Sequence, residues 1–171
     1  MSISTLAATA AMFIFAFTMV CAGVTDLTTY KIRNRLVLLF LLAYAVLAPL
    51  AGFTAGEIGR SAAVAAGVLL FGFIFFSLGW IGGGDAKLAA ATALWFGADH
   101  TPAFLIYMAL LGCAFTLVIL QFRVLPLPAR LQNRSWIARL HSRESKVPYG
   151  VAMAVAALVV FPQTRWMTAM F

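Results

Sequence analysis

Six long apolar stretches alternate with short polar segments along the chain. They cover roughly residues 4–25, 36–55, 61–81, 86–97, 103–122 and 149–162. Most of them approach the roughly 20 residues that a helix needs to cross a hydrocarbon core about 30 Å thick. The pattern predicts an all-α polytopic membrane protein with six transmembrane helices, forming a single membrane-embedded domain over residues 1–171.

The apolar stretches are continuous and rich in Ala, Leu and Phe. Strands of a membrane barrel instead alternate apolar and polar residues over about 10 positions, so helices are expected. The first stretch lacks the basic start of a secretory signal, because no Lys or Arg precedes Lys31. We therefore expect it to be retained as the first transmembrane helix.

Composition agrees with a membrane location. The chain is 64% hydrophobic and 10% charged, and its mean hydropathy is +1.00, which is far from a soluble domain. Cys21 and Cys113 lie singly in apolar stretches, and without a CxxC pair they predict inert thiols. The formal net charge of +7 could indicate nucleic acid, but the position of the basic residues favours a role in membrane topology.

Most basic residues follow the first and fifth apolar stretches. They are Lys31, Arg33 and Arg35 after the first, and Arg123, Arg130, Arg134, Arg139, Arg143 and Lys146 after the fifth. The positive-inside rule places both segments in the cytoplasm, which puts both termini on the outer, periplasmic side. Lys87 joins them, so ten of the twelve basic residues are inside, and Arg60 and Arg165 remain outside.

The fourth stretch is the shortest of the six. The residues from Ala86 to Gly97 would rise only about 18 Å as a helix. A re-entrant segment here would move the most basic segment to the outer face, against the same rule. We therefore predict a crossing helix that holds Asp85 somewhat below the membrane surface.

Two further patterns predict contacts rather than chemistry. Small residues four positions apart, at Ala63 and Gly67 and at Ala89 and Ala93, predict faces where helices pack closely.

In the segment 126–147, Pro128 favours a helix start and apolar residues recur among arginines. This segment is either a helix lying on the membrane surface or a solvated basic loop.

Acidic residues are few, and charge at membrane depth is costly, so each one is a candidate for function. They are Asp26, Glu57, Asp85, Asp99 and Glu144. Asp26 ends the first helix and Asp85 begins the fourth, and both ends are predicted on the cytoplasmic side. Glu57 and Asp99 fall on the opposite side, so the topology predicts that Asp26 and Asp85 can meet.

A pair of carboxylates can hydrolyse a peptide bond with water alone. One member stays ionised and activates the water, while its protonated partner polarises the carbonyl. Gly82, Gly83 and Gly84 stand directly before Asp85 and would let an extended substrate strand approach closely. Taken singly, Asp85 could instead be a helix N-cap after a hinge, and Asp26 a solvated helix end.

Three motifs in order resemble the type IV prepilin peptidases and archaeal preflagellin peptidases. Gly82-Gly83-Gly84-Asp85-Ala86-Lys87 fits the GxGDxK signature of that family. Asp26 followed by Lys31-Ile32-Arg33-Asn34 is similar to the family's first aspartate and its basic Ile-Pro-Asn stretch. Lys146-Val147-Pro148-Tyr149-Gly150-Val151-Ala152 is similar to its Pro-Tyr-Gly motif.

Two departures refine the resemblance. Arg33 stands where the family usually has proline, which affects the local turn rather than the predicted pair. The Cys-rich insertion that follows the first helix in bifunctional members is missing from this sequence, so N-methyltransferase activity is not expected. The short chain resembles the small peptidases of tight-adherence (Flp) pilus systems.

The resemblance implies an aspartic endopeptidase of the bacterial inner membrane that acts at the cytoplasmic face. Its partner would be a prepilin or pilin-like precursor, whose basic leader is removed by water activated between Asp26 and Asp85. Lys87, Asn34 and Tyr149 are supporting candidates, together with the three glycines before Asp85. We expect no cofactor and no nucleic-acid partner.

Two other functions remain open from the residues alone. A proton-coupled transporter would need an ionisable group near the midplane, and the sequence offers only carboxylates at helix ends. A noncatalytic assembly subunit is the second alternative. His100 and His141 lie on opposite sides in the predicted topology and have no metal-ligand spacing, so no metal site is expected.

Overall fold

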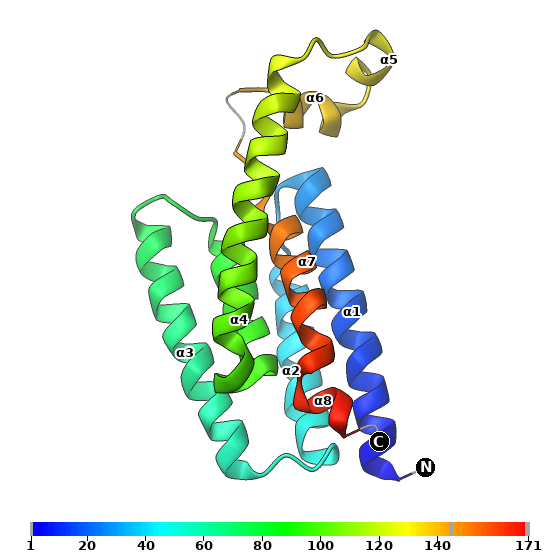
Figure 1. The fold of residues 1–171 in the computed structure, drawn as a ribbon, viewed down its shortest axis with the longest axis vertical. Helices are drawn as coiled ribbons and strands as arrows, with labels where there is room; N and C mark the ends of the chain where they lie inside the picture. Colours follow the sequence, from blue (N-terminus) through cyan, green and yellow to red (C-terminus); the bar gives the residue numbers. More distant parts are fainter. Residues whose placement is uncertain (1, 144–145, 170–171) are drawn as a thin grey trace.

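The computed structural model describes residues 2–143 and 146–169, which form helices joined by short connections (Figure 1). The elements are α1 (Ile3–Thr29), α2 (Asn34–Leu50), α3 (Ala55–Ser77), α4 (Gly83–Val124), α5 (Ala129–Gln132), α6 (Ser135–His141), α7 (Tyr149–Val160), η1 (Phe161–Gln163) and α8 (Arg165–Thr168). The described residues contain no strand. The predicted all-α class is confirmed.

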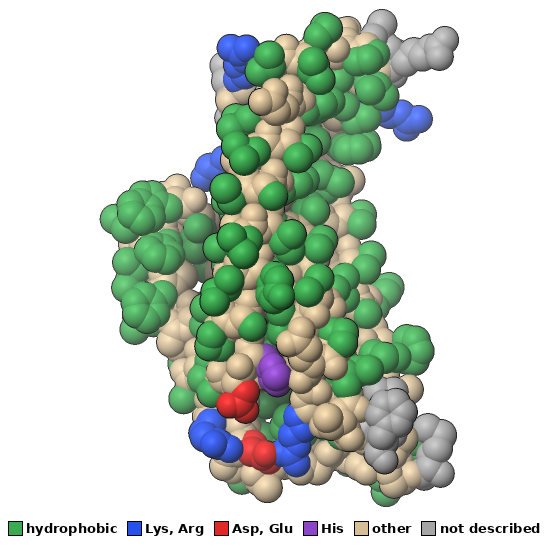
Figure 2. Space-filling model, viewed as in Figure 1, with side chains coloured by type: hydrophobic (Ala, Val, Ile, Leu, Met, Phe, Trp, Pro, Cys, Tyr) green, Lys and Arg blue, Asp and Glu red, His purple; other side chains and the backbone are tan. Residues whose placement is uncertain are grey.

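Three helices are long and apolar enough to cross a membrane, namely α1, α3 and α4. Two further apolar segments, Asn34–Leu50 and Tyr149–Gln163, are shorter. Figure 2 shows hydrophobic side chains over most of the visible face and charged side chains gathered towards its two ends. This distribution fits a protein surrounded by lipid, while six crossings and their orientation remain predictions.

The element α4 is two helical arms separated at Gly97. Gly97 has φ 65° and ψ −168°, a backbone conformation outside the helical region and favourable only for glycine. Ala86 and Thr116 line the same cavity, although 30 residues of straight helix would separate them by about 45 Å. The chain therefore turns back at Gly97, and Figure 1 shows the turn near the end that carries both termini.

Aromatic side chains build the core near that end. The indole of Trp95 stacks on Phe40 with ring centroids 4.8 Å apart, and Phe15 stacks on Phe161 at 4.1 Å. Each buried indole also satisfies its N–H, because Trp95 donates to the Phe40 carbonyl at 3.3 Å and Trp166 to the Trp95 carbonyl at 3.0 Å. These contacts hold α1, α2, the first arm of α4 and α8 together.

The prediction of close helix contacts is half right. Ala89 and Ala93 are buried, as expected, with 7% and 0% of their surface exposed. The prediction for Ala63 and Gly67 is wrong, because Ala63 is exposed and a Cβ on Gly67 would meet nothing within 4 Å. The close approach of α3 to α4 occurs at Gly72, where a Cβ would lie 3.0 Å from the Ala86 Cβ.

The segment after α4 carries the short helices α5 and α6, which lie at the end of the molecule far from the termini (Figure 1). Pro128 is the N-cap of α5, as the sequence indicated. The imidazole Nε2 of His141 lies 2.8 Å from the Leu125 carbonyl, so α6 is attached to the end of α4. Glu144 lies outside the described residues, and contact of this segment with a membrane surface stays a prediction.

The Gly72 contact generates a test of the packing of α3. We expect Gly72→Leu to lower the free energy of unfolding by roughly 1–3 kcal/mol, because the new side chain must displace Ala86 or tilt α3. Gly67→Leu is the matched control on the same helix, where a Cβ meets open space. Thermal unfolding in detergent would measure both, and equal effects would contradict the packing described here.

Candidate active site

One large cavity, of about 900 Å³, lies between α3, both arms of α4 and the segment that leads into α7. Its polar end carries the carboxylates of Asp26 and Asp85. Away from this end the lining is apolar and includes Val68, Leu105 and Met153. The structure thus brings together the two residues that the sequence predicted as a pair, although they are 59 positions apart.

Asp26 is buried at the end of α1, with 6% of its surface exposed. Its Oδ2 accepts a hydrogen bond of 2.7 Å from the backbone N–H of Gly150. Gly150 is in the first turn of α7, where N–H groups have no partner inside the helix and favour an anion. A Cβ on Gly150 would lie 2.8 Å from both Cβ and Oδ2 of Asp26, so only glycine permits this approach.

Asp85 is in the first turn of α4, directly after the glycines. A Cβ on Gly82 would lie 2.9 Å from the Asp85 Oδ2, and one on Gly84 would lie 3.1 Å from the Ile32 Cβ. Gly83 packs beside Phe76, at 3.3 Å for the same hypothetical atom. The glycines therefore let the start of α4 lie against the connection between α1 and α2, which places Asp85 at the Asp26 end of the bundle.

The supporting candidates occupy different places. The Nζ of Lys87 donates to Oδ1 of Asn34 at 3.1 Å, and this exposed pair ties the start of α4 to the start of α2. Tyr149 lines the cavity. Its ring lies on Gly112, where a Cβ would be 2.5 Å from the Tyr149 Cε1. Lys87 and Asn34 thus join the two motif segments, whereas Tyr149 shapes the cavity wall.

Three residues of this end were not among the predicted site residues: Tyr30, Lys146 and Gly150. Tyr30 and Lys146 line the cavity, and Tyr30 has a left-handed backbone with φ 56°. Burial raises the pKa of the Tyr30 phenol, against the attraction of the Arg123 and Arg139 charges. Gly150 could have been found from the Pro-Tyr-Gly motif, but Tyr30 carries no signal in the sequence alone.

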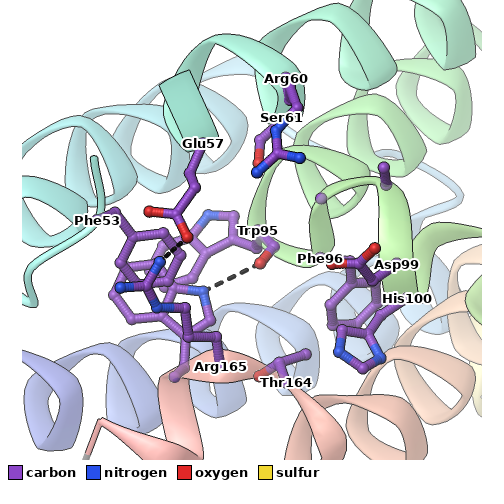
Figure 3. A pocket seen from close by; sticks show the side chains of 13 residues that line it. Phe53, Glu57, Arg60, Ser61, Trp95, Phe96, Asp99, His100, Thr164 and Arg165 are labelled. Atoms are coloured by element: carbon purple, nitrogen blue, oxygen red, sulfur yellow. Dashed lines mark hydrogen bonds and ion pairs between the residues drawn. The ribbon is translucent and has the colours of Figure 1, made fainter. Parts of the chain in front are cut away.

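A second, smaller pocket of about 90 Å³ lies at the other end of the bundle (Figure 3). Glu57, Asp99, His100 and Arg60 line it. Glu57 forms an ion pair with Arg165 and also closes a capping box with Thr54 at the start of α3. The guanidinium of Arg165 lies 4.7 Å from the centre of the Phe53 ring.

The two pockets separate four of the five acidic residues into the two predicted pairs, and Glu144 lies outside the described residues. Asp26 and Asp85 share the large cavity, whereas Glu57 and Asp99 share the small pocket. Within residues 2–143 and 146–169, no group of three or more His, Cys, Asp or Glu side chains could hold a metal ion. The two carboxylates that share the large cavity can act together as an acid and a base.

Comparison with known proteins adds an independent finding. Residues 13–117 match the model of the type IV leader peptidase family. Searches of curated proteins and of solved structures found no match. The matched region covers more than half of the 171 residues and includes Asp26, the glycines and Asp85. The chain therefore belongs to the type IV leader peptidase family, and this membership together with its apolar helices marks it as a multi-pass membrane protein.

Proposed function

We propose that the chain is an aspartic endopeptidase that removes the leader peptide of prepilins or pilin-like precursors. Its family suggests leader peptidase activity. The observation that carries the proposal is the cavity shared by Asp26 and Asp85, since two carboxylates at one site are sufficient for peptide hydrolysis with water. A proton-coupled transporter would need an ionisable group near the midplane, whereas Asp26 and Asp85 lie at helix ends. A noncatalytic assembly subunit would not require the pair.

In the proposed reaction the two carboxylates share one proton. The ionised member takes a proton from a bound water molecule, whose oxygen attacks the peptide carbonyl carbon. The protonated member donates to the carbonyl oxygen, so the intermediate is an uncharged tetrahedral diol. Its collapse breaks the C–N bond as the protonated carboxyl donates its proton to the leaving nitrogen. The ionised carboxylate takes a proton from a hydroxyl of the diol, which becomes the carboxylic acid product, so the pair again holds one shared proton.

The shape of the cavity supports a substrate that is polar at the cleaved bond and apolar beyond it. From the carboxylates the lining continues along α3 and α4 through Val68, Phe71, Phe75, Leu105 and Met108. We propose that the apolar segment of the precursor lies against this lining, while its basic leader stays at the end that carries the carboxylates. Burial of apolar surface then positions the peptide bond between the two acids.

The proposal makes the two acids indispensable. We expect Asp26→Asn and Asp85→Asn each to reduce processing by at least about a hundredfold, because an amide keeps the shape but cannot transfer the proton. Asp99→Asn is the matched control, since Asp99 lines the small pocket at the other end. Co-expression with a pilin precursor, followed by its size on a gel, gives the readout. Full processing by either of the first two variants would refute the pair.

The contact of Gly150 with Asp26 gives a second test. Gly150→Ala would place a methyl group 2.8 Å from the Asp26 Oδ2, so we expect the carboxylate to be displaced and processing to fall by about tenfold or more. Gly23→Ala is the control in the same interface, with a milder contact of 3.3 Å to the Ala154 Cβ. Equal losses in the two variants would assign the effect to helix packing instead.

The proposed topology can be tested by labelling. In a Cys21→Ala, Cys113→Ala background, we expect Asn133→Cys to react with a membrane-impermeant maleimide only after permeabilisation, because its basic segment is placed in the cytoplasm. Gln163→Cys should react in intact cells. Both positions are exposed, so access to the reagent depends on the side of the membrane. The reverse pattern would place the carboxylates at the outer face and contradict the proposal.

A further inference from the structure

Arg123 is a buried cation in the last turn of α4, outside the region that matches the family. Its exposed fraction is 9%. Its Nε donates to the Leu140 carbonyl at 2.9 Å, and one terminal nitrogen donates to the Lys146 carbonyl at 3.2 Å. Burying a guanidinium is costly unless it is hydrogen-bonded, so these contacts fix where the two carbonyls lie.

One carbonyl belongs to the last turn of α6, and the other to the stretch that leads into α7. Leu140 is in the last turn of α6, where carbonyls without helical partners attract a cation. Lys146 begins the stretch that enters α7. Arg123 therefore links the last turn of α6 and the stretch that begins at Lys146 to the end of α4.

The stretch from Lys146 to Gly150 is short and leads directly to the carboxylate pair. Lys146, Pro148 and Tyr149 line the large cavity. Pro148 is buried and has a ring-restricted φ of −75°. The backbone N–H of Gly150 then donates a hydrogen bond of 2.7 Å to the Asp26 Oδ2. A displacement of the Lys146 carbonyl would be transmitted over four residues to this hydrogen bond.

We propose that Arg123 is a positioning residue, which holds residues 146–150 so that the Gly150 N–H stays on Asp26. The positioning rests on the contacts of Arg123 alone, whereas its effect on catalysis rests on the proposed function. The fork of the guanidinium reaches two acceptors that lie six residues apart in sequence. A lysine ammonium can replace only part of this arrangement, and glutamine leaves the charge-assisted bonds unmade.

Hydrogen exchange of the purified full chain in detergent tests the positioning without depending on activity. We expect Arg123→Gln to speed exchange of the Gly150 amide by about tenfold or more, while the amides of α3 keep their wild-type rates. Arg134→Gln is the matched control, because it removes the same charge from an exposed position at the start of α6. Asp26→Ala removes the acceptor directly and shows the rate of an unbonded Gly150 amide.

Activity of the same variants tests the catalytic consequence. At equal amounts of folded protein, we expect Arg123→Gln to lower kcat for precursor cleavage about tenfold or more, with KM changed less than about threefold. KM should stay close to the wild-type value, because the substitution does not change the apolar lining on α3 and α4 that is proposed to bind the precursor. Arg123→Lys should fall between Arg123→Gln and the wild type in both kcat and Gly150 exchange.

The outcomes separate this inference from the function on which it rests. Wild-type exchange of Gly150 in Arg123→Gln overturns the inference, and so does faster exchange across all helices, which would reveal a general structural role. An unchanged kcat, or a loss as large in Arg134→Gln, also overturns it. If the wild-type chain cleaves no precursor, the proposed function fails, while the exchange rates still decide whether Arg123 positions Gly150.

Discussion

The hydrogen bond from the first turn of α7 to the carboxylate of Asp26 is the contact around which the polar end of the molecule is arranged. Its partners, Gly150 and Asp26, are 124 positions apart in the sequence. A carboxylate buried among helices needs donors, and the unpaired N–H groups at a helix start supply them without another charge. The contact also requires that α1 and α7 approach within a distance that excludes any side chain at position 150.

Other features of this end follow from the same requirement. Residues 146–150 must hold the Gly150 N–H within hydrogen-bond distance of Asp26. The buried side chains of Arg123 and Pro148 restrict the position of this stretch. The start of α4 must reach the same level, and Gly84 allows it to lie against Ile32. Two acidic side chains repel each other when both are ionised, so their mutual interaction does not bring them together. The two carboxylates share a cavity because the backbone approaches closely at Gly150 and at Gly84.

Much of this arrangement was readable from the sequence. The apolar stretches located the helices, and the short fourth stretch indicated a separate helix that ends near Gly97, where α4 turns back. The crossing of the membrane by this arm and the depth of Asp85 stay predictions. The motif named Tyr149 as a supporting candidate, and the structure places it in the lining of the cavity, while its role stays a prediction. The position of Gly72 in the contact with α4, and the left-handed Tyr30, could not be inferred, because both depend on which helices become neighbours. Arg123 was read only as one of many basic residues, since its burial is a tertiary property.

The helix α3 packs principally on α4, and Ser61 and Gly72 are its only buried residues. It forms one wall of the cavity, whereas the contact between Asp26 and α7 lies on the other side. A tilt of α3 would consequently widen or narrow the space for a guest without altering the contact between Asp26 and Gly150, in which α3 takes no part. Mechanically, the helix that adapts to a guest is separate from the contact that holds Asp26 in place.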